Sequence, residues 1–294
     1  MIALTPEVED AVRENRPVVA LETTLVAHGF PDGEGLGVAL EAERRVRAAG
    51  AVPATIGVLE GEARCGLSEA ELERFAAEGS AARKVGPRDL AVAVVQRALG
   101  ATTVGGTLAV CALAGIRFMG TGGIGGVHRG FAARPDVSAD LAALARTQTL
   151  VVSSGAKSLL DVPATLEALE TLGVPVLGWR TKTLPLFYAA GGGPAVPDGV
   201  ETAPEAAAVA RAHWRLGCGG LLLAQPPAES LDVESLIEAA LADAEASAVT
   251  GQDVTPFVLA RLHSETDGAS IRVNKRLIAD NAALAAEVAV AYSD

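Results

Sequence analysis

The sequence is poor in cysteine and in aromatic side chains. Three of its 294 residues are cysteine, and aromatic residues make up 3% of the chain. Cys65, Cys111 and Cys218 form no CxxC pair and are odd in number, which argues against a disulfide framework and against a zinc site. We expect each to be a small buried hydrophobe. No apolar run reaches the roughly 18 residues that a membrane-spanning helix needs.

Positive charge is also scarce. The 24 basic residues face 36 acidic ones, which gives a formal net charge of −12. Such a balance disfavours nucleic acid as a partner, although a local group of N–H donors and cations could still hold one phosphate. The N-terminal segment lacks the basic and apolar regions of a secretory signal. We therefore expect a cytoplasmic protein with no nucleic-acid or membrane partner.

Short apolar strands alternate with amphipathic helices along the chain. This alternation predicts the α/β class, as a single α/β/α domain over residues 1–294 with a mostly parallel sheet covered by helices on both faces. The predicted strands are 18–24, 55–61, 116–123, 149–154, 174–179 and 219–225. The predicted helices are 5–15, 37–50, 69–79, 87–100, 102–115, 137–147, 158–173, 203–217, 232–249, 255–268 and 269–292.

Polar clusters follow three of the predicted strands. They are ETT (22–24), GTGGIGGVHRG (120–130) and SSGAKS (153–158). Ligands of open parallel sheets bind beyond the carboxyl ends of the strands, so these clusters predict the functional site. Glu22 ends an apolar strand, where burial would raise its pKa and suit it to proton transfer. The alternative is a salt bridge to a basic residue.

The glycine-rich segment 120–130 matches neither the Rossmann fingerprint nor a Walker A motif. Its N–H groups could form an anion nest for a sugar phosphate, with Thr121 or Arg129 assisting, or it could be a tight structural turn. Asp136 and Asp140 have the spacing that shares one helix face, which would suit a hard divalent ion with mostly water ligands. Alternatively, Ser138 caps a helix and Asp140 is an ordinary first-turn acid.

Only four of the basic residues are lysines, so Lys157 is an unusual choice in this chain. It is expected at a strand-to-helix junction, where an apolar wall and a helix N-terminus would lower its pKa. A neutral amine there could form a Schiff base, or the residue could instead hold a phosphate. Arginine could not take the first role, because it stays protonated. His28 and His128 lie near glycines, and either histidine alone is only weak evidence for a functional role.

Several motifs resemble those of the pseudouridine-5′-phosphate glycosidase family. They include VVALETTLVAHGFP, ARKVGPRDL, GTGGIGGVHRG, PDVSADLAALART and SSGAKSLLDVPATLEALETLGVPVLGW, and the similarity runs from about residue 17 to the C-terminus. The resemblance implies reversible cleavage of the C–C glycosidic bond of pseudouridine 5′-phosphate to uracil and ribose 5-phosphate. It also implies α/β/α subunits, one Mn²⁺ per subunit and a homotrimer.

The resemblance also assigns residues to the site. Lys157 matches the family's catalytic lysine, which forms a Schiff base with ring-opened ribose, and Glu22 matches its acid/base. Asp136 matches its metal ligand. The matching substrate contacts and pocket-lining positions are Ser138, Ala139, Asp140, Lys84, Val104, His128 and Asn274, to which the glycine loop adds Thr121.

Two other functions are compatible with the same residues. A related C-glycosynthase would join ribose 5-phosphate to another aromatic acceptor, because the chemistry is reversible. A non-catalytic sugar-phosphate-binding protein would not need Lys157, Glu22 and Asp136 together. Lys84 and Asn274 suit the imide edge of uracil and favour the glycosidase.

Overall fold

The strands of this protein form one mostly parallel sheet. The computed structural model describes residues 2–31, 33–133, 135–249 and 254–293, and within them eleven strands join in the order β1-β4-β3-β2-β7-β8-β11-β9-β10, with β6 pairing to β3 and β5 pairing to β6. The strands are β1 (Ile2–Leu4), β2 (Val18–Glu22), β3 (Val52–Leu59), β4 (Glu62–Cys65), β5 (Arg83–Val85), β6 (Gly100–Thr102), β7 (Phe118–Gly120), β8 (Leu150–Ser153), β9 (Val176–Trp179), β10 (Asp198–Val200) and β11 (Leu221–Ala224).

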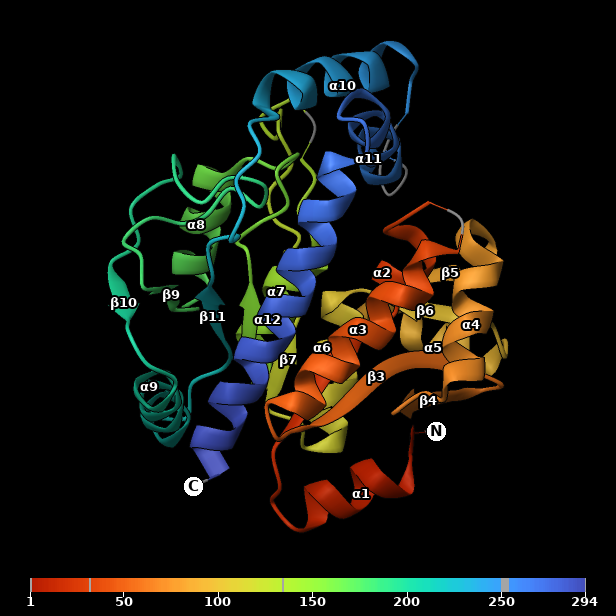
Figure 1. The fold of residues 1–294 in the computed structure, drawn as a ribbon, viewed down its shortest axis with the longest axis vertical. Coiled ribbons are helices and arrows are strands. Elements are labelled where there is room, and N and C mark those ends of the chain that lie inside the picture. The colour runs from red at the N-terminus through yellow and green to blue at the C-terminus, as the bar shows by residue number, and fades with distance from the viewer. Residues whose placement is uncertain (1, 32, 134, 250–253, 294) are drawn as a thin grey trace.

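Helices cover both faces of this sheet, as predicted. In Figure 1, α12 and α3 cross in front of the central strands, and α6 and α7 lie behind them. The helices are α1 (Pro6–Arg13), α2 (Thr24–His28), α3 (Glu34–Ala48), α4 (Glu69–Glu78), α5 (Leu90–Val95), α6 (Val104–Ala114), α7 (Ala139–Arg146), α8 (Val162–Thr171), α9 (Ala203–Arg215), α10 (Glu234–Ala246), α11 (Val254–Glu265) and α12 (Ala269–Ser293).

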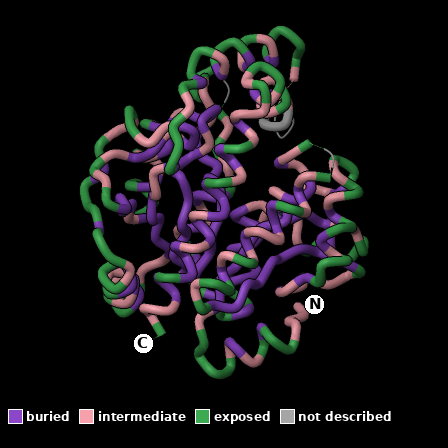
Figure 2. The backbone as a smooth tube through the Cα atoms, viewed as in Figure 1, coloured by how far each residue is buried: buried purple, intermediate pink, exposed green. Residues whose placement is uncertain are grey.

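The central strands are buried along their whole length. Every residue of β2, β3, β8, β9 and β11 is buried, and Figure 2 shows this continuous buried centre. Burial on both faces explains why these strands read as unbroken apolar runs instead of alternating patterns. Among the described helices, none combines the length and hydrophobicity that crossing a bilayer requires.

Several predicted boundaries were wrong. The segment 87–100 is a 3-10 turn and the short helix α5, followed by a tight turn in which Arg97 has φ 53°. Gly100 then starts strand β6, where its missing side chain makes room for Val58 and Val85. Helix α8 begins at Val162 and not at 158, because Asp161 caps it by accepting from the Ala164 N–H. These helix and strand ends depend on contacts between residues distant in sequence, which the local sequence pattern does not reveal.

Other elements were missed or misplaced at their ends. Strands β1, β4, β5 and β10 had no prediction, and all are short. Strand β6 includes the ends of the predicted helices 87–100 and 102–115, and helix α2 begins at the last residue of the predicted strand 18–24. Cys65 and Cys111 are buried free thiols, as predicted, whereas Cys218 is only partly buried. Burial raises the pKa of Cys65 to about 12, so this thiol stays protonated and behaves as an apolar side chain.

Gly120, the last residue of β7, lets α12 approach the sheet. A Cβ added there would lie 2.8 Å from the Ala282 Cα. We predict that Gly120→Ala lowers the free energy of unfolding by about 1–3 kcal/mol through overpacking. The control is Gly37→Ala in α3, where an added Cβ meets nothing within 4 Å. Gly37→Ala should leave the free energy of unfolding unchanged or raise it by up to about 1 kcal/mol. Urea unfolding measures both, and equal effects would contradict the packing argument.

Candidate active site

The ends of three adjacent strands form the centre of the candidate site. Strand β2 ends at Glu22, β7 ends at Gly120 and β8 ends at Ser153. They are parallel neighbours, since Leu21 pairs with Gly120 and Gly120 pairs with Val152. The predicted convergence of the three polar clusters is therefore confirmed.

Glu22 is a buried carboxylate with one satisfied oxygen. Its exposed fraction is 3%, and Thr121 Oγ1 donates a hydrogen bond of 2.5 Å to its Oε1. Its Oε2 is buried and has no hydrogen-bond partner among the described residues. Burial raises the pKa of Glu22, as predicted, while the Lys157 charge and the Thr121 hydrogen bond oppose that rise. The result is a buried carboxyl group with one oxygen that has no partner among the described residues.

Thr121 is itself fixed from helix α12. Asn281 Nδ2 donates to the Thr121 carbonyl at 2.8 Å and to Ser154 Oγ at 3.2 Å. The Thr121 hydroxyl was predicted to assist phosphate binding, but in this structure it binds Glu22. Asn281 thus connects the segments after β7 and β8, and through Thr121 it orients the Glu22 carboxylate.

Asn274, a predicted pocket residue, lies on the same helix. It is buried, and its Oδ1 has no partner among the described residues. A Cβ added to Gly122 would lie 3.5 Å from this oxygen, so Asn274 packs against the glycine-rich segment. An unpartnered buried amide oxygen is costly unless a ligand or water satisfies it, which makes Asn274 a candidate ligand contact.

The N–H groups of the glycine-rich segment are largely used inside the protein. Backbone or side-chain oxygens accept from the N–H groups of Thr121, Ile124, Gly125, Val127 and His128. The prediction of an anion nest is therefore not supported for these donors. The glycines serve close packing instead, because Cβ atoms would collide with Phe187 at Gly123 and with Thr165 at Gly126.

Asp140 clamps two segments together. The N–H of Gly105 donates to its Oδ1 at 2.7 Å, and the N–H of Gly125 donates to its Oδ2 at 2.9 Å. Ser138 caps α7 by accepting from the Asp140 N–H, as expected. Asp136 precedes this helix, so the prediction that Asp136 and Asp140 share a helix face was wrong.

Lys157 lies in a loop and not at a helix start. The segment 154–161, called the Lys157 loop below, follows β8 and precedes α8, so no helix N-terminus adjoins the residue. Its N–H donates to the Ile124 carbonyl at 3.0 Å. The side chain is partly buried, and its charge acts on the Glu22 carboxylate. The part of the prediction that relied on a helix dipole was wrong.

Other predicted residues surround this centre. The charge of Lys84, on β5, also lowers the pKa of Glu22, and Lys84 is itself engaged in an interaction. Val104 is the buried first residue of α6, next to the Asp140 clamp. The His128 N–H donates to the Asp136 carbonyl at 3.0 Å, which places these two residues together. Ala139 is the exposed first residue of α7.

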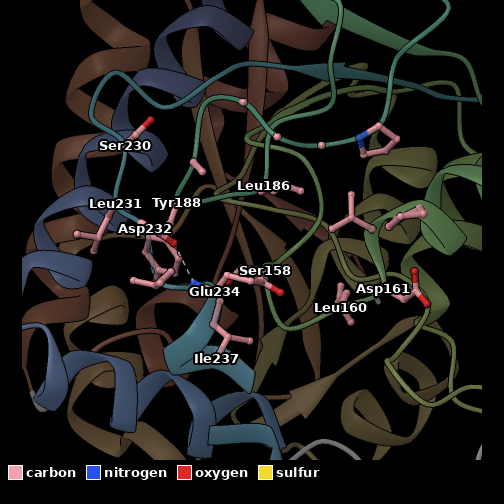
Figure 3. Close-up of a pocket in the computed structure, with 18 of the residues that line it drawn as sticks. Ser158, Leu160, Asp161, Leu186, Tyr188, Ser230, Leu231, Asp232, Glu234 and Ile237 are labelled. Carbon is pink, nitrogen blue, oxygen red and sulfur yellow. Dashed lines mark hydrogen bonds between the residues drawn. The ribbon is translucent and has the colours of Figure 1, made fainter. Parts of the chain in front are cut away.

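A cavity of about 940 Å³ lies beside the Lys157 loop. Figure 3 shows Ser158, Leu160 and Asp161 facing it, together with Tyr188 and Glu234. Arg129 also lines this cavity, but Lys157 and Glu22 do not. Arg129 binds the carbonyls of the Lys157 loop and Glu234, so the prediction that it assists phosphate binding gains no support.

Asn281 is the residue that the sequence reasoning missed. It lies seven residues, or two helical turns, after Asn274 in an Ala- and Val-rich helix. Two amides on one face of an otherwise apolar helix are a signal, because buried polar side chains need partners. Ser154 and Thr165 gave no such signal, since the groups that donate to their hydroxyls, Asn281 Nδ2 and the Val127 N–H, lie far away in the sequence.

The raised pKa of Glu22 predicts a pH-dependent stability. Below its ordinary pKa of 4.5 the folded and unfolded states both hold the proton, and above it the unfolded state ionises first. The Glu22 contribution is therefore lost as pH rises through the folded pKa. We predict that Glu22→Gln gains stability over the native chain from acid to neutral pH, by about 1.4 kcal/mol per unit of raised pKa. Exposed Glu73→Gln is the control, and a Glu22→Gln difference that does not change with pH would contradict the assignment.

Comparison with known proteins identifies the family. The model of the indigoidine synthase A-like protein family matches residues 7–291. Pseudouridine-5′-phosphate glycosidases from Chloroflexus aurantiacus and Escherichia coli are 50% and 43% identical, covering 100% and 99% of this chain and 99% and 96% of theirs. The prealnumycin C-glycosynthase solved with ribulose 5-phosphate has a TM-score of 0.89 and 38% identity, covering 100% of this chain and 97% of that one. The chain belongs to the pseudouridine-5′-phosphate glycosidase family, within the indigoidine synthase A-like proteins.

Proposed function

We propose that this protein is an enzyme that reversibly cleaves pseudouridine 5′-phosphate to uracil and ribose 5-phosphate. The observation that carries the proposal is that the charge of Lys157, in the loop after β8, acts on the buried Glu22 carboxylate at the end of β2. The names of its relatives support the substrate, with identities of 43–51% over nearly the whole chain.

The bond to be broken explains why an amine is needed. A C-glycoside leaves as a carbon base, which is a poor leaving group. We propose that the Lys157 amine adds to C1′ of the ribose as the ring oxygen departs, which opens the ring. The attacking nitrogen loses one proton, and the departing oxygen takes up one proton to become a hydroxyl. The C1′–C5 bond then breaks, its electrons stay with the base, and C5 takes a proton from Glu22. The nitrogen lone pair forms the C1′=N imine, and water hydrolyses it to ribose 5-phosphate and the free amine.

This mechanism makes Lys157 irreplaceable by arginine. We predict that Lys157→Arg abolishes uracil release from pseudouridine 5′-phosphate, because a guanidinium is not deprotonated. Borohydride added with ribose 5-phosphate should attach one reduced sugar phosphate to the peptide that contains Lys157. Lys182→Arg, on an exposed side chain, is the matched control and should stay active. An active Lys157→Arg variant, or an adduct on another lysine, would refute the covalent mechanism.

Mn²⁺ is the proposed cofactor, with Asp136 as its protein ligand. No group of three or more His, Cys, Asp or Glu side chains suited to a metal occurs among the described residues, so most other ligands would be water. A lone, partly buried carboxylate with water fits a hard divalent ion. When bound, the ion would supply positive charge for anionic substrate oxygens.

The metal assignment has its own test. We predict that Asp136→Ala slows uracil release at least tenfold at low Mn²⁺ and weakens Mn²⁺ binding by titration calorimetry, with the melting temperature unchanged. Asp198→Ala, in the exposed part of β10, is the matched control. Unchanged Mn²⁺ affinity and an unchanged metal response of activity would remove Asp136 from the metal site.

One observation favours a second function. The C-glycosynthase with a TM-score of 0.89 was solved with ribulose 5-phosphate, so its site accepts a pentose phosphate. A glycosynthase role would use the same residues with another aromatic acceptor. Failure to release uracil, combined with imine trapping of ribose 5-phosphate, would favour that role. A sugar-phosphate-binding protein without activity would show neither result.

The proposal includes a cytoplasmic homotrimer. This part rests on the family resemblance. Exposed apolar side chains such as Val95, Leu113 and Leu216 are available for contacts between subunits. Single apolar side chains are common on protein surfaces, so they indicate candidate contacts only.

A further inference from the structure

Arg129 makes three polar contacts at the end of the glycine-rich segment. Its Nε donates to the Leu160 carbonyl at 3.3 Å, and its NH2 group donates to the Ser158 carbonyl at 3.0 Å. The same nitrogen lies 2.7 Å from Glu234 Oε1, on the first residue of α10. The Arg129 side chain has an exposed fraction of 31%, so this guanidinium is largely enclosed by its partners.

Two of these contacts hold the Lys157 loop. Ser158 follows Lys157 directly, and Leu160, three residues after Lys157, donates its N–H to the Lys157 carbonyl at 3.0 Å. The Lys157 N–H is bound on the other side by the Ile124 carbonyl. This segment belongs to no helix or named strand, so side-chain donors replace part of the missing regular hydrogen bonding.

The third contact fixes Arg129 itself. Glu234 supplies the counter-charge, and Figure 3 shows Glu234 and Ser158 among the residues around the cavity. A guanidinium forms several hydrogen bonds in a fixed plane, which a lysine amine cannot reproduce. With two carbonyls and one carboxylate as partners, Arg129 is occupied by the protein and is not placed as a phosphate ligand.

We propose that Arg129 is a positioning residue for Lys157, and that its ion pair with Glu234 couples the Lys157 loop to helix α10. The effect on turnover rests on the proposed function, whereas the effect on the loop does not. Positioning of a nucleophile to within about 1 Å can change a rate by about 100-fold. Arg129 therefore contributes to the reaction without touching the substrate.

The test is Arg129→Lys, with Arg272→Lys as matched control. Arg272 pairs with Glu229 at 2.9 Å on the surface, so it repeats the substitution at an ion pair away from the loop. We expect Arg129→Lys to lower kcat roughly 10- to 100-fold with KM changed less than about threefold. Borohydride trapping of ribose 5-phosphate should slow in parallel. Hydrogen exchange at the Leu160 amide should become faster in the substrate-free protein, and the control should change none of these.

The outcomes separate this inference from its rivals. A raised KM for the phosphorylated substrate with normal kcat would make Arg129 a phosphate ligand and overturn the proposal. Unchanged kcat and unchanged Leu160 exchange would also overturn it. If Arg129→Lys does not fold, Glu234→Gln decides, because it removes the carboxylate charge alone and should give faster Leu160 exchange and a smaller loss of kcat. If the native protein releases no uracil, the proposed function fails, and hydrogen exchange still tests the positioning.

Discussion

The burial of the Glu22 carboxylate governs the arrangement of the site. A carboxyl group with 3% exposure must be hydrogen-bonded, charge-paired or protonated, because an isolated buried charge is costly. Thr121 supplies the hydrogen bond, while Lys157 and Lys84 supply positive charge. Each of these residues comes from a different strand end or edge, so the sheet order brings the stabilising groups together. The parallel pairing of β2, β7 and β8 is thus a condition for the proposed chemistry.

Close packing around the segment after β7 fixes the positions of the residues in the candidate site. The segment after β7 has glycines where helix α12, Phe187 and Thr165 approach, so larger residues would push these elements apart. Because α12 lies so near, Asn281 can bind the Thr121 carbonyl and also Ser154. The same segment continues to Arg129, which holds the Lys157 loop. One irregular stretch therefore aligns both proposed catalytic residues, which explains why it is rich in glycine without offering its donors to an anion.

The local hydrophobic pattern of the sequence predicted the central strands of the sheet and the location of the candidate active site. Long apolar runs and the polar residues that end them are read directly from the chain, so β2, β8 and the position of Glu22 were predicted. The start of α8 at Val162, the strand at Gly100 and the clamp at Asp140 depend on partners distant in sequence. Periodicity carries no information on such contacts. The internal partners of Thr121 and Arg129 could not be predicted for the same reason, since the chemistry of these side chains suggested only a ligand.

The electrostatic interaction between Lys157 and Glu22 sets the order of the proton transfers in the proposed reaction. In the resting site the lysine charge is the strongest influence opposing the raised pKa of Glu22. Addition of the amine to C1′ requires that the lysine first give up a proton and its charge. The pKa of Glu22 then rises further, because burial remains and the opposing charge is gone. The carboxylate becomes a better proton acceptor at the moment when the amine releases a proton, and it can then deliver that proton to the departing base. An arginine at 157 would keep its charge throughout, so this further rise in the pKa of Glu22 would not occur.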